Sequence, residues 1–171
     1  FNARKLKACC LGSTGEDGVE VHYRVARCDG NGLLAVGVDV VDLTLHVDAC
    51  LLDGAHVQNA LECSLGGTFI DCGDNGIDGS QCGRMAIGTK GMVTSKPKKG
   101  NKTHRVVASG GHGVLLTACA EVVIDDLECV DTGLEGVRCD RTGDAGDTSV
   151  GEQSVSVAGG GGDGLRVIGN R

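Results

Sequence analysis

The segments Cys28-Asp-Gly-Asn-Gly32, Cys50-Leu-Leu-Asp-Gly54 and Cys72-Gly-Asp-Asn-Gly76 decide the fold class of this chain. In each segment a cysteine is followed four residues later by a glycine, and successive cysteines are 22 residues apart. Self-similarity at a fixed period of about 20 to 50 residues is typical of a solenoid, in which each repeat buries its apolar side against its neighbours. We therefore expect a stack of coils of about 22 residues each.

Apolar residues repeat with the same period. Four columns show it: Val19, Val41 and Cys63; Val21, Leu43 and Leu65; Val25, Val47 and Phe69; Leu33, Ala55 and Ile77. Polar residues such as Asp42 and Thr44 alternate with them, and this period of two is typical of strands with one buried face. Together with the glycine turns and the lack of a helical period, the pattern predicts an all-β fold, a right-handed parallel β-helix.

The period is interrupted once and then resumes. The next glycine equivalent to Gly76 is Gly113, 37 residues later, which is one coil of 22 residues plus 15. The interval includes KPKKGNKTHR (96–105), which contains the only proline and a dense run of positive charge. We expect residues 83–105 to form an inserted lysine-rich loop that leaves the coil.

Composition agrees with a narrow solenoid. The chain has 171 residues, enough for one domain with a real core. It has 30 glycines, two phenylalanines, one tyrosine and no tryptophan, which suits tight turns and a bore with little room for rings. The net charge of −7 argues against nucleic acid as the main partner. No stretch approaches the roughly 18 apolar residues of a membrane helix, so no membrane span is expected.

Residues 1–171 are predicted to form a single β-helix domain. Because Phe1 is not an initiator methionine and the last coil stops at Arg171 without a visible cap, we expect a fragment or a processed product. An uncapped coil exposes unpaired strand edges, which favours an end-to-end homo-oligomer.

The ten cysteines allow two interpretations. They can serve as small interior hydrophobes, since cysteine is among the most buried residue types. Alternatively, disulfides form among Cys9, Cys10, Cys28, Cys50 and Cys72, because neighbouring coils lie within the distance that a disulfide spans. No Cys-x-x-Cys pair occurs, and neither a metal site nor a cofactor is expected.

One short motif favours secretion. The sequon Asn101-Lys-Thr103 lies in the lysine-rich segment, where a glycan on Asn101 would be accessible. With the even number of cysteines, it indicates a secreted or extracellular protein.

A polar residue precedes each column glycine. Along the chain these residues are Asn31, Asp53, Asn75, His112, Glu135 and Asp163. Asn-Gly and Asp-Gly are turn dipeptides, so the line can be explained by turn formation alone. His112 and Glu135 are not typical turn residues, so a functional site remains the other interpretation.

Four segments resemble the ordered motifs of polygalacturonase-type glycoside hydrolases. The segments are Leu52-Asp-Gly-Ala-His-Val-Gln-Asn59, Gly73-Asp-Asn-Gly-Ile77, Ser109-Gly-Gly-His-Gly113 and Gly136-Val-Arg-Cys-Asp140. They are similar to the family's Asn-Thr-Asp-Gly, Gly-Asp-Asp-Cys, Gly-His-Gly and Arg-Ile-Lys motifs, in the same order. The resemblance implies a right-handed β-helix and inverting hydrolysis of an acidic polysaccharide.

Inverting hydrolysis requires an acid for the leaving group and a base for water. The resemblance implies Asp74 as the acid, Asp53 as the base and His112 as the residue that tunes them. Arg138, Asn75 and His56 are the implied substrate-binding residues, with Arg138 holding the sugar carboxylate.

The chain departs from these motifs at several positions. Asn75 stands in place of the second aspartate and Asp140 in place of the lysine that helps to bind the anionic sugar. A missing carboxylate and a repulsive one predict weak or no cleavage. The prediction is therefore a degenerate relative, or one of altered specificity. The alternative is a noncatalytic structural β-helix such as a filament, adhesin or surface subunit.

Overall fold

The computed structural model describes residues 2–4, 21–88, 104–140, 148–150 and 155–168. These residues form strands and no helix, so the predicted all-β class is confirmed. None of them forms a helix that would be long and apolar enough to cross a membrane.

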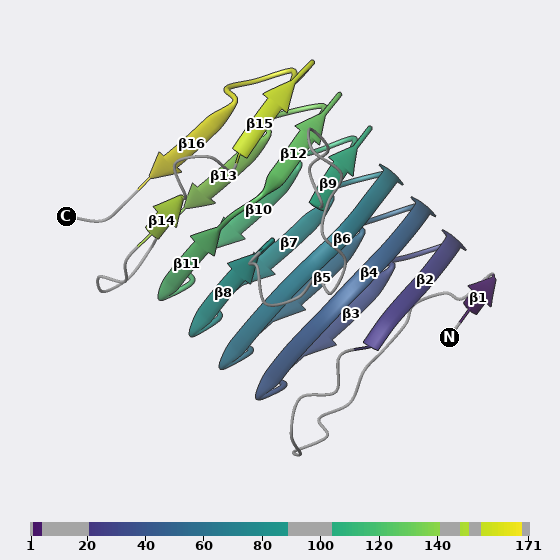
Figure 1. Ribbon diagram of the computed structural model, residues 1–171, viewed down its shortest axis with the longest axis horizontal. Coiled ribbons are helices and arrows are strands. Elements are labelled where there is room, and N and C mark those ends of the chain that lie inside the picture. The colour runs from purple at the N-terminus through teal and green to yellow at the C-terminus, as the bar shows by residue number, and fades with distance from the viewer. Residues whose placement is uncertain (1, 5–20, 89–103, 141–147, 151–154, 169–171) are drawn as a thin grey trace.

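The strands form two parallel sheets that run along the molecule side by side (Figure 1). The first sheet has ten strands: β1 (Asn2–Arg4), β2 (Val21–Cys28), β4 (Val40–Cys50), β6 (Glu62–Cys72), β8 (Arg84–Ile87), β9 (His104–Val107), β11 (Glu121–Ile124), β12 (Leu127–Val130), β14 (Thr148–Val150) and β15 (Val155–Ala158). The second has six: β3 (Leu33–Val36), β5 (Ala55–Gln58), β7 (Ile77–Ser80), β10 (Val114–Thr117), β13 (Val137–Asp140) and β16 (Leu165–Ile168).

The strand register follows the 22-residue period. In the first sheet Val25 pairs with Val47 and Val47 with Phe69. Cys28, Cys50 and Cys72 pair in the same way. The predicted apolar and cysteine columns are therefore confirmed as neighbours on adjacent parallel strands, except for Val19, which lies outside the described residues.

The 15 extra residues interrupt the strand that follows β6 in the first sheet. The first half of β6 pairs with β8 and its second half with β9, so two short strands together occupy the place of one long strand. Met85 and Ile87 in β8, and His104 and Val106 in β9, are buried, because side chains of a strand alternate between the two faces. β8 and the first two residues of β9 lie within the range 83–105 that was expected to form a loop, so these parts of the range are strands of the first sheet instead. Residues 89–103, including Asn101, lie outside the described part.

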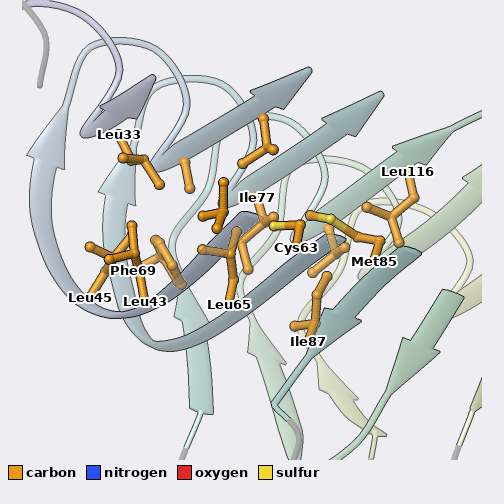
Figure 2. Close-up of a cluster of buried hydrophobic side chains, with 14 of the residues drawn as sticks. Leu33, Leu43, Leu45, Cys63, Leu65, Phe69, Ile77, Met85, Ile87 and Leu116 are labelled. Atoms are coloured by element: carbon orange, nitrogen blue, oxygen red, sulfur yellow. The ribbon is translucent and has the colours of Figure 1, made fainter. Parts of the chain in front are cut away.

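The core is a row of aliphatic side chains between the two sheets. Its largest fully buried members include Phe69, Leu33, Leu65, Ile77, Met85, Ile87 and Leu116 (Figure 2). These side chains belong to one hydrophobic cluster to which strands of both sheets contribute.

The cysteines in the described part of the chain are buried thiols: Cys28, Cys50, Cys63, Cys72, Cys82, Cys119, Cys129 and Cys139. Burial raises the pKa of Cys50 and of Cys72 to about 12. Since the thiolate is the reactive form, these side chains behave as small hydrophobes. The disulfides expected among Cys28, Cys50 and Cys72 are not present in the structure, and Cys9 and Cys10 lie outside the described residues.

A glycine makes room for a buried histidine beside the insertion. Nδ1 of His104 accepts a hydrogen bond of 2.8 Å from the backbone N–H of Gly67, and His104 is 2% exposed. A Cβ atom on Gly66 would lie 2.6 Å from Cε1 of His104, and Gly67 has a φ of 115°, where side chains are strained. The imidazole therefore occupies the space that Gly66 leaves empty, while Gly67 provides the N–H donor.

His104 predicts a pH dependence of stability. Burial lowers its pKa below the ordinary value of 6.5, so the folded state favours the neutral ring. The free energy that the neutral ring contributes to folding is fully present above the pKa of the unfolded state. It is lost as the pH falls through that value toward the lower pKa of the folded state. In His104→Asn the amide oxygen can still accept from Gly67, but nothing titrates. Urea unfolding at about pH 7.5 and about pH 5 should therefore show a smaller loss of stability in the variant. Equal losses in the two proteins would contradict this assignment.

Candidate functional site

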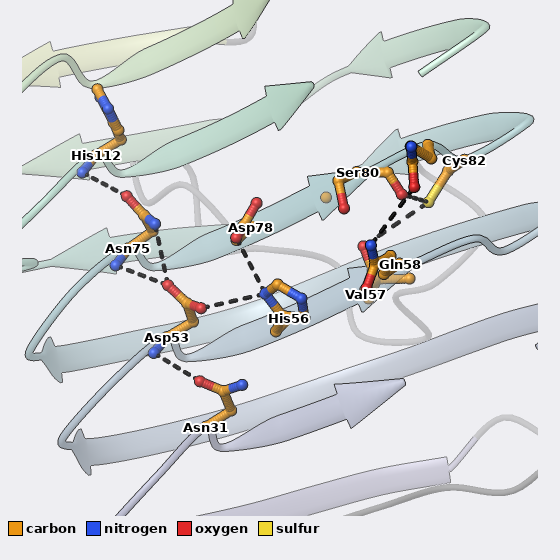
Figure 3. A network of polar contacts seen from close by, with 12 residues as sticks. Asn31, Asp53, His56, Val57, Gln58, Asn75, Asp78, Ser80, Cys82 and His112 are labelled. Atoms are coloured by element: carbon orange, nitrogen blue, oxygen red, sulfur yellow. Dashed lines mark hydrogen bonds and ion pairs between the residues drawn. The ribbon is translucent and has the colours of Figure 1, made fainter. Parts of the chain in front are cut away.

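A column of polar side chains follows the turn between the first and the second sheet. We call Asn31, Asp53, Asn75, His112 and Glu135 the polar column. Figure 3 shows its first four members. The backbone N–H of Asp53 donates to Oδ1 of Asn31 at 3.0 Å, and that of Asn75 donates to Oδ1 of Asp53 at 3.0 Å. The backbone N–H of His112 donates to Oδ1 of Asn75 at 2.9 Å. Each side chain thus bonds to the next coil.

These bonds give the first members of the column a structural role. Asp53, Asn75 and His112 are more than nine-tenths buried, and an unpaired N–H at such a position is costly. A short side chain with an acceptor oxygen, Asn or Asp, satisfies the N–H of the coil that follows. The turn interpretation therefore accounts for Asn31, Asp53 and Asn75.

Asp53 has both carboxylate oxygens engaged. Its Oδ1 accepts a second hydrogen bond, from Nδ2 of Asn75 at 3.0 Å. Its Oδ2 lies 3.3 Å from Nδ1 of His56. As the implied water-activating base, Asp53 would have to give up one of these contacts. Asn75, an implied substrate-binding residue, is likewise engaged with Asp53 and with His112.

Asp74, the implied acid, lies outside the polar column. Its backbone N–H donates to the carbonyl of Leu52, and its own carbonyl accepts from Gly111. It therefore belongs to the neighbouring row of turn residues, and it is exposed, whereas Asp53 and Asn75 are buried. The structure brings Asp53 and His112 into one column, with Asn75 between them, and sets Asp74 beside it.

Arg138 lies at the C-terminal end of the column among carboxylates. Its Nη2 is 2.7 Å from Oδ2 of Asp140, and its Nη1 is 3.8 Å from Oε1 of Glu135. Arg166 approaches the same Oε1 at 3.5 Å. On the other side of Glu135, Oε2 lies 3.0 Å from Nδ1 of His112. Glu135 therefore joins His112, the histidine of the column, to two arginines.

A second charged group surrounds His56 in β5. Nδ1 of His56 lies 3.0 Å from Oδ2 of Asp78 in β7, as well as 3.3 Å from Oδ2 of Asp53. Burial and the charge of Asp53 raise the pKa of Asp78. The sequence-based prediction included His56 among the site residues but not Asp78. The signal was present, because the two residues are 22 positions apart and therefore share an outward row.

Comparisons of the chain with protein-family models, with curated proteins and with solved structures give no match. The resemblance to polygalacturonases therefore depends on the four motifs alone.

Proposed function

We propose that the chain is a right-handed parallel β-helix that binds an acidic polysaccharide without hydrolysing it. The solenoid architecture is supported by the 22-residue register, which the first and second sheets share. Repetition of a coil that contains two strands produces two parallel sheets with the same period.

The absence of hydrolysis follows from the engagement of Asp53. Inverting hydrolysis needs a carboxylate with a free oxygen facing a water, opposite a second carboxyl group. Oδ1 of Asp53 holds two hydrogen bonds from Asn75, and Oδ2 faces His56. The position that would hold the second aspartate of the motif is occupied by Asn75, which supports the column instead.

Two arginines in register carry the binding proposal. Arg138 and Arg166 are paired residues of β13 and β16, on the outer face of the second sheet. Their side chains are 30% and 47% exposed. Glu135 and Asp140 orient them, and a guanidinium has five N–H donors, so donors remain for a ligand. A guanidinium pair suits sugar carboxylates, which it can bind with paired hydrogen bonds.

Oligogalacturonate is the probe that tests this proposal. Wild-type protein should bind it without releasing reducing ends, and Arg138→Ala with Arg166→Ala should weaken binding at least about tenfold, since each charged hydrogen bond contributes about 1.5–3 kcal/mol. Calorimetry measures the affinity. Arg84→Gln is the matched control, because Arg84 is a half-exposed arginine on the first sheet, paired with Glu121.

Two outcomes would count against the proposal. The first is equal affinity in the control and in the double arginine variant. The second is cleavage that disappears in Asp53→Asn, which would make Asp53 a catalytic residue and restore the hydrolase interpretation.

A noncatalytic structural subunit is the second candidate function. The observation in its favour is a pair of adjacent apolar side chains at one turn, Leu51 and Leu52, which are 66% and 47% exposed. Exposed apolar pairs of this kind are typical of contact surfaces. In this proposal the protein is secreted and assembles with copies of itself, and sedimentation over a wide concentration range would detect the polymer.

A further inference from the structure

We propose that Asp53, His56 and Asp78 form a binding site for a divalent transition-metal ion such as Zn²⁺. The three side chains each offer one ligand atom, and these atoms lie within 4.8 Å of one another. The site is separate from the arginines that carry the polysaccharide proposal, and it does not depend on that function.

The distances fit a single ion. Nδ1 of His56 is 3.0 Å from Oδ2 of Asp78 and 3.3 Å from Oδ2 of Asp53 (Figure 3). Zinc bonds of about 2.0–2.2 Å at tetrahedral or octahedral angles place ligand atoms about 3.0–3.6 Å apart. Both distances from Nδ1 of His56 lie in this range, and the three ligand atoms lie within 4.8 Å of one another.

The ligands are held in place by the fold. His56 and Asp78 face each other in register on neighbouring parallel strands, β5 and β7. Asp53 is 7% exposed, and the backbone and side-chain nitrogens of Asn75 both donate to its Oδ1. This leaves Oδ2 directed at His56. Hydrogen bonds that orient a ligating carboxylate through its second oxygen are a regular feature of metal sites.

The negative charges of Asp53 and Asp78 also favour the binding of a cation. Two carboxylates approach one imidazole nitrogen, which carries at most one proton and can donate it to only one of them. A divalent ion neutralises both carboxylates, and the side chain of His56 is 24% exposed, which leaves a route from solvent.

The ligand atoms favour a particular class of ion. One imidazole nitrogen with two carboxylate oxygens suits Zn²⁺, Fe²⁺, Co²⁺ or Ni²⁺ better than Ca²⁺ or Mg²⁺, which prefer oxygen ligands alone. Three protein ligands leave at least one position for water, as in catalytic zinc sites.

The experiment is a titration of the reduced full chain with Co²⁺ and, in competition, with Zn²⁺. Cobalt reports its ligands through visible absorption, and it distinguishes nitrogen and oxygen ligands from thiolates, which add an intense charge-transfer band. Two variants each remove one ligand and are chosen to preserve the fold. His56→Leu copies its in-register neighbour Leu34, and Asp78→Asn preserves the side-chain shape. His46→Gln, on the first sheet, is the control for binding to a surface histidine.

We expect one cobalt ion per chain without a thiolate band, displaced by Zn²⁺. His56→Leu and Asp78→Asn should each weaken binding by at least about tenfold, and His46→Gln should bind like the wild type. Circular dichroism establishes that each variant is folded. The proposal is overturned if the wild type binds no cobalt at millimolar concentration, if the thiolate band appears, or if the folded His56→Leu variant binds as tightly as the wild type.

Discussion

Val47→Asp should abolish folding of the domain. Val47 is 0% exposed and lies in register between Val25 and Phe69, so a carboxylate there would face only apolar neighbours. An isolated buried charge costs several kcal/mol, which is comparable to the whole stability of a typical domain, about 5–15 kcal/mol. Far-ultraviolet circular dichroism and urea unfolding should show an unfolded or severely destabilised chain.

The control for this variant is one residue away on the same strand. His46→Asp introduces the same carboxylate at a half-buried position that faces outward, since neighbours in a strand point to opposite faces. It should change the free energy of unfolding far less than Val47→Asp. Comparable stability in the two variants would mean that the two faces of β4 are wrongly assigned.

Asn75→Ala should produce the second large loss. The change removes the acceptor of the buried N–H of His112 and one of the two donors to Oδ1 of Asp53. Each buried polar group left without a partner costs about 1–3 kcal/mol, so the total should be about 2–5 kcal/mol. Urea unfolding measures it.

Asn31→Ala tests the same chemistry with one bond. Asn31 is only half-buried and accepts a single bond from the column, the one from the backbone N–H of Asp53. Its loss should therefore be clearly smaller than that of Asn75→Ala. Equal losses at the two positions would show that the hydrogen bonds of the polar column do not determine its stability.

The apolar columns of the fold were predictable, because two simple periods specify them. A period of two assigns Val47 to the inside, and a period of 22 assigns Val25 and Phe69 as its neighbours. The range 83–105 expected for the insertion contains the interruption between β8 and β9. Counting from Gly76 to Gly113 did not reveal that strands of the first sheet continue into both ends of that range.

The candidate site was predicted only in part. The spacing of the turn glycines identified Asp53, Asn75 and His112 as one column, and the hydrogen bonds confirm it. A motif cannot reveal that Asp74 is exposed while its neighbour Asn75 is buried, since that depends on the local path of the turn. The predicted site did not include Asp78 because it was built from the turn residues that precede the glycines. The outward-facing residues of the second sheet were not compared between repeats.

The junction between β8 and β9 is a position where the chain can accept inserted residues. β8 and β9 are each bonded to β6, so both ends of the 89–103 segment are anchored whatever that segment contains. Gly88, with a φ of 72° and an N–H bonded to Leu65, ends the first half. One coil later β11 and β12 are divided at the same point by only Asp125 and Asp126. β14 and β15 are separated at the same point by four residues. Because the length of this junction already differs from one repeat to the next, a foreign domain grafted there should leave the neighbouring strands intact.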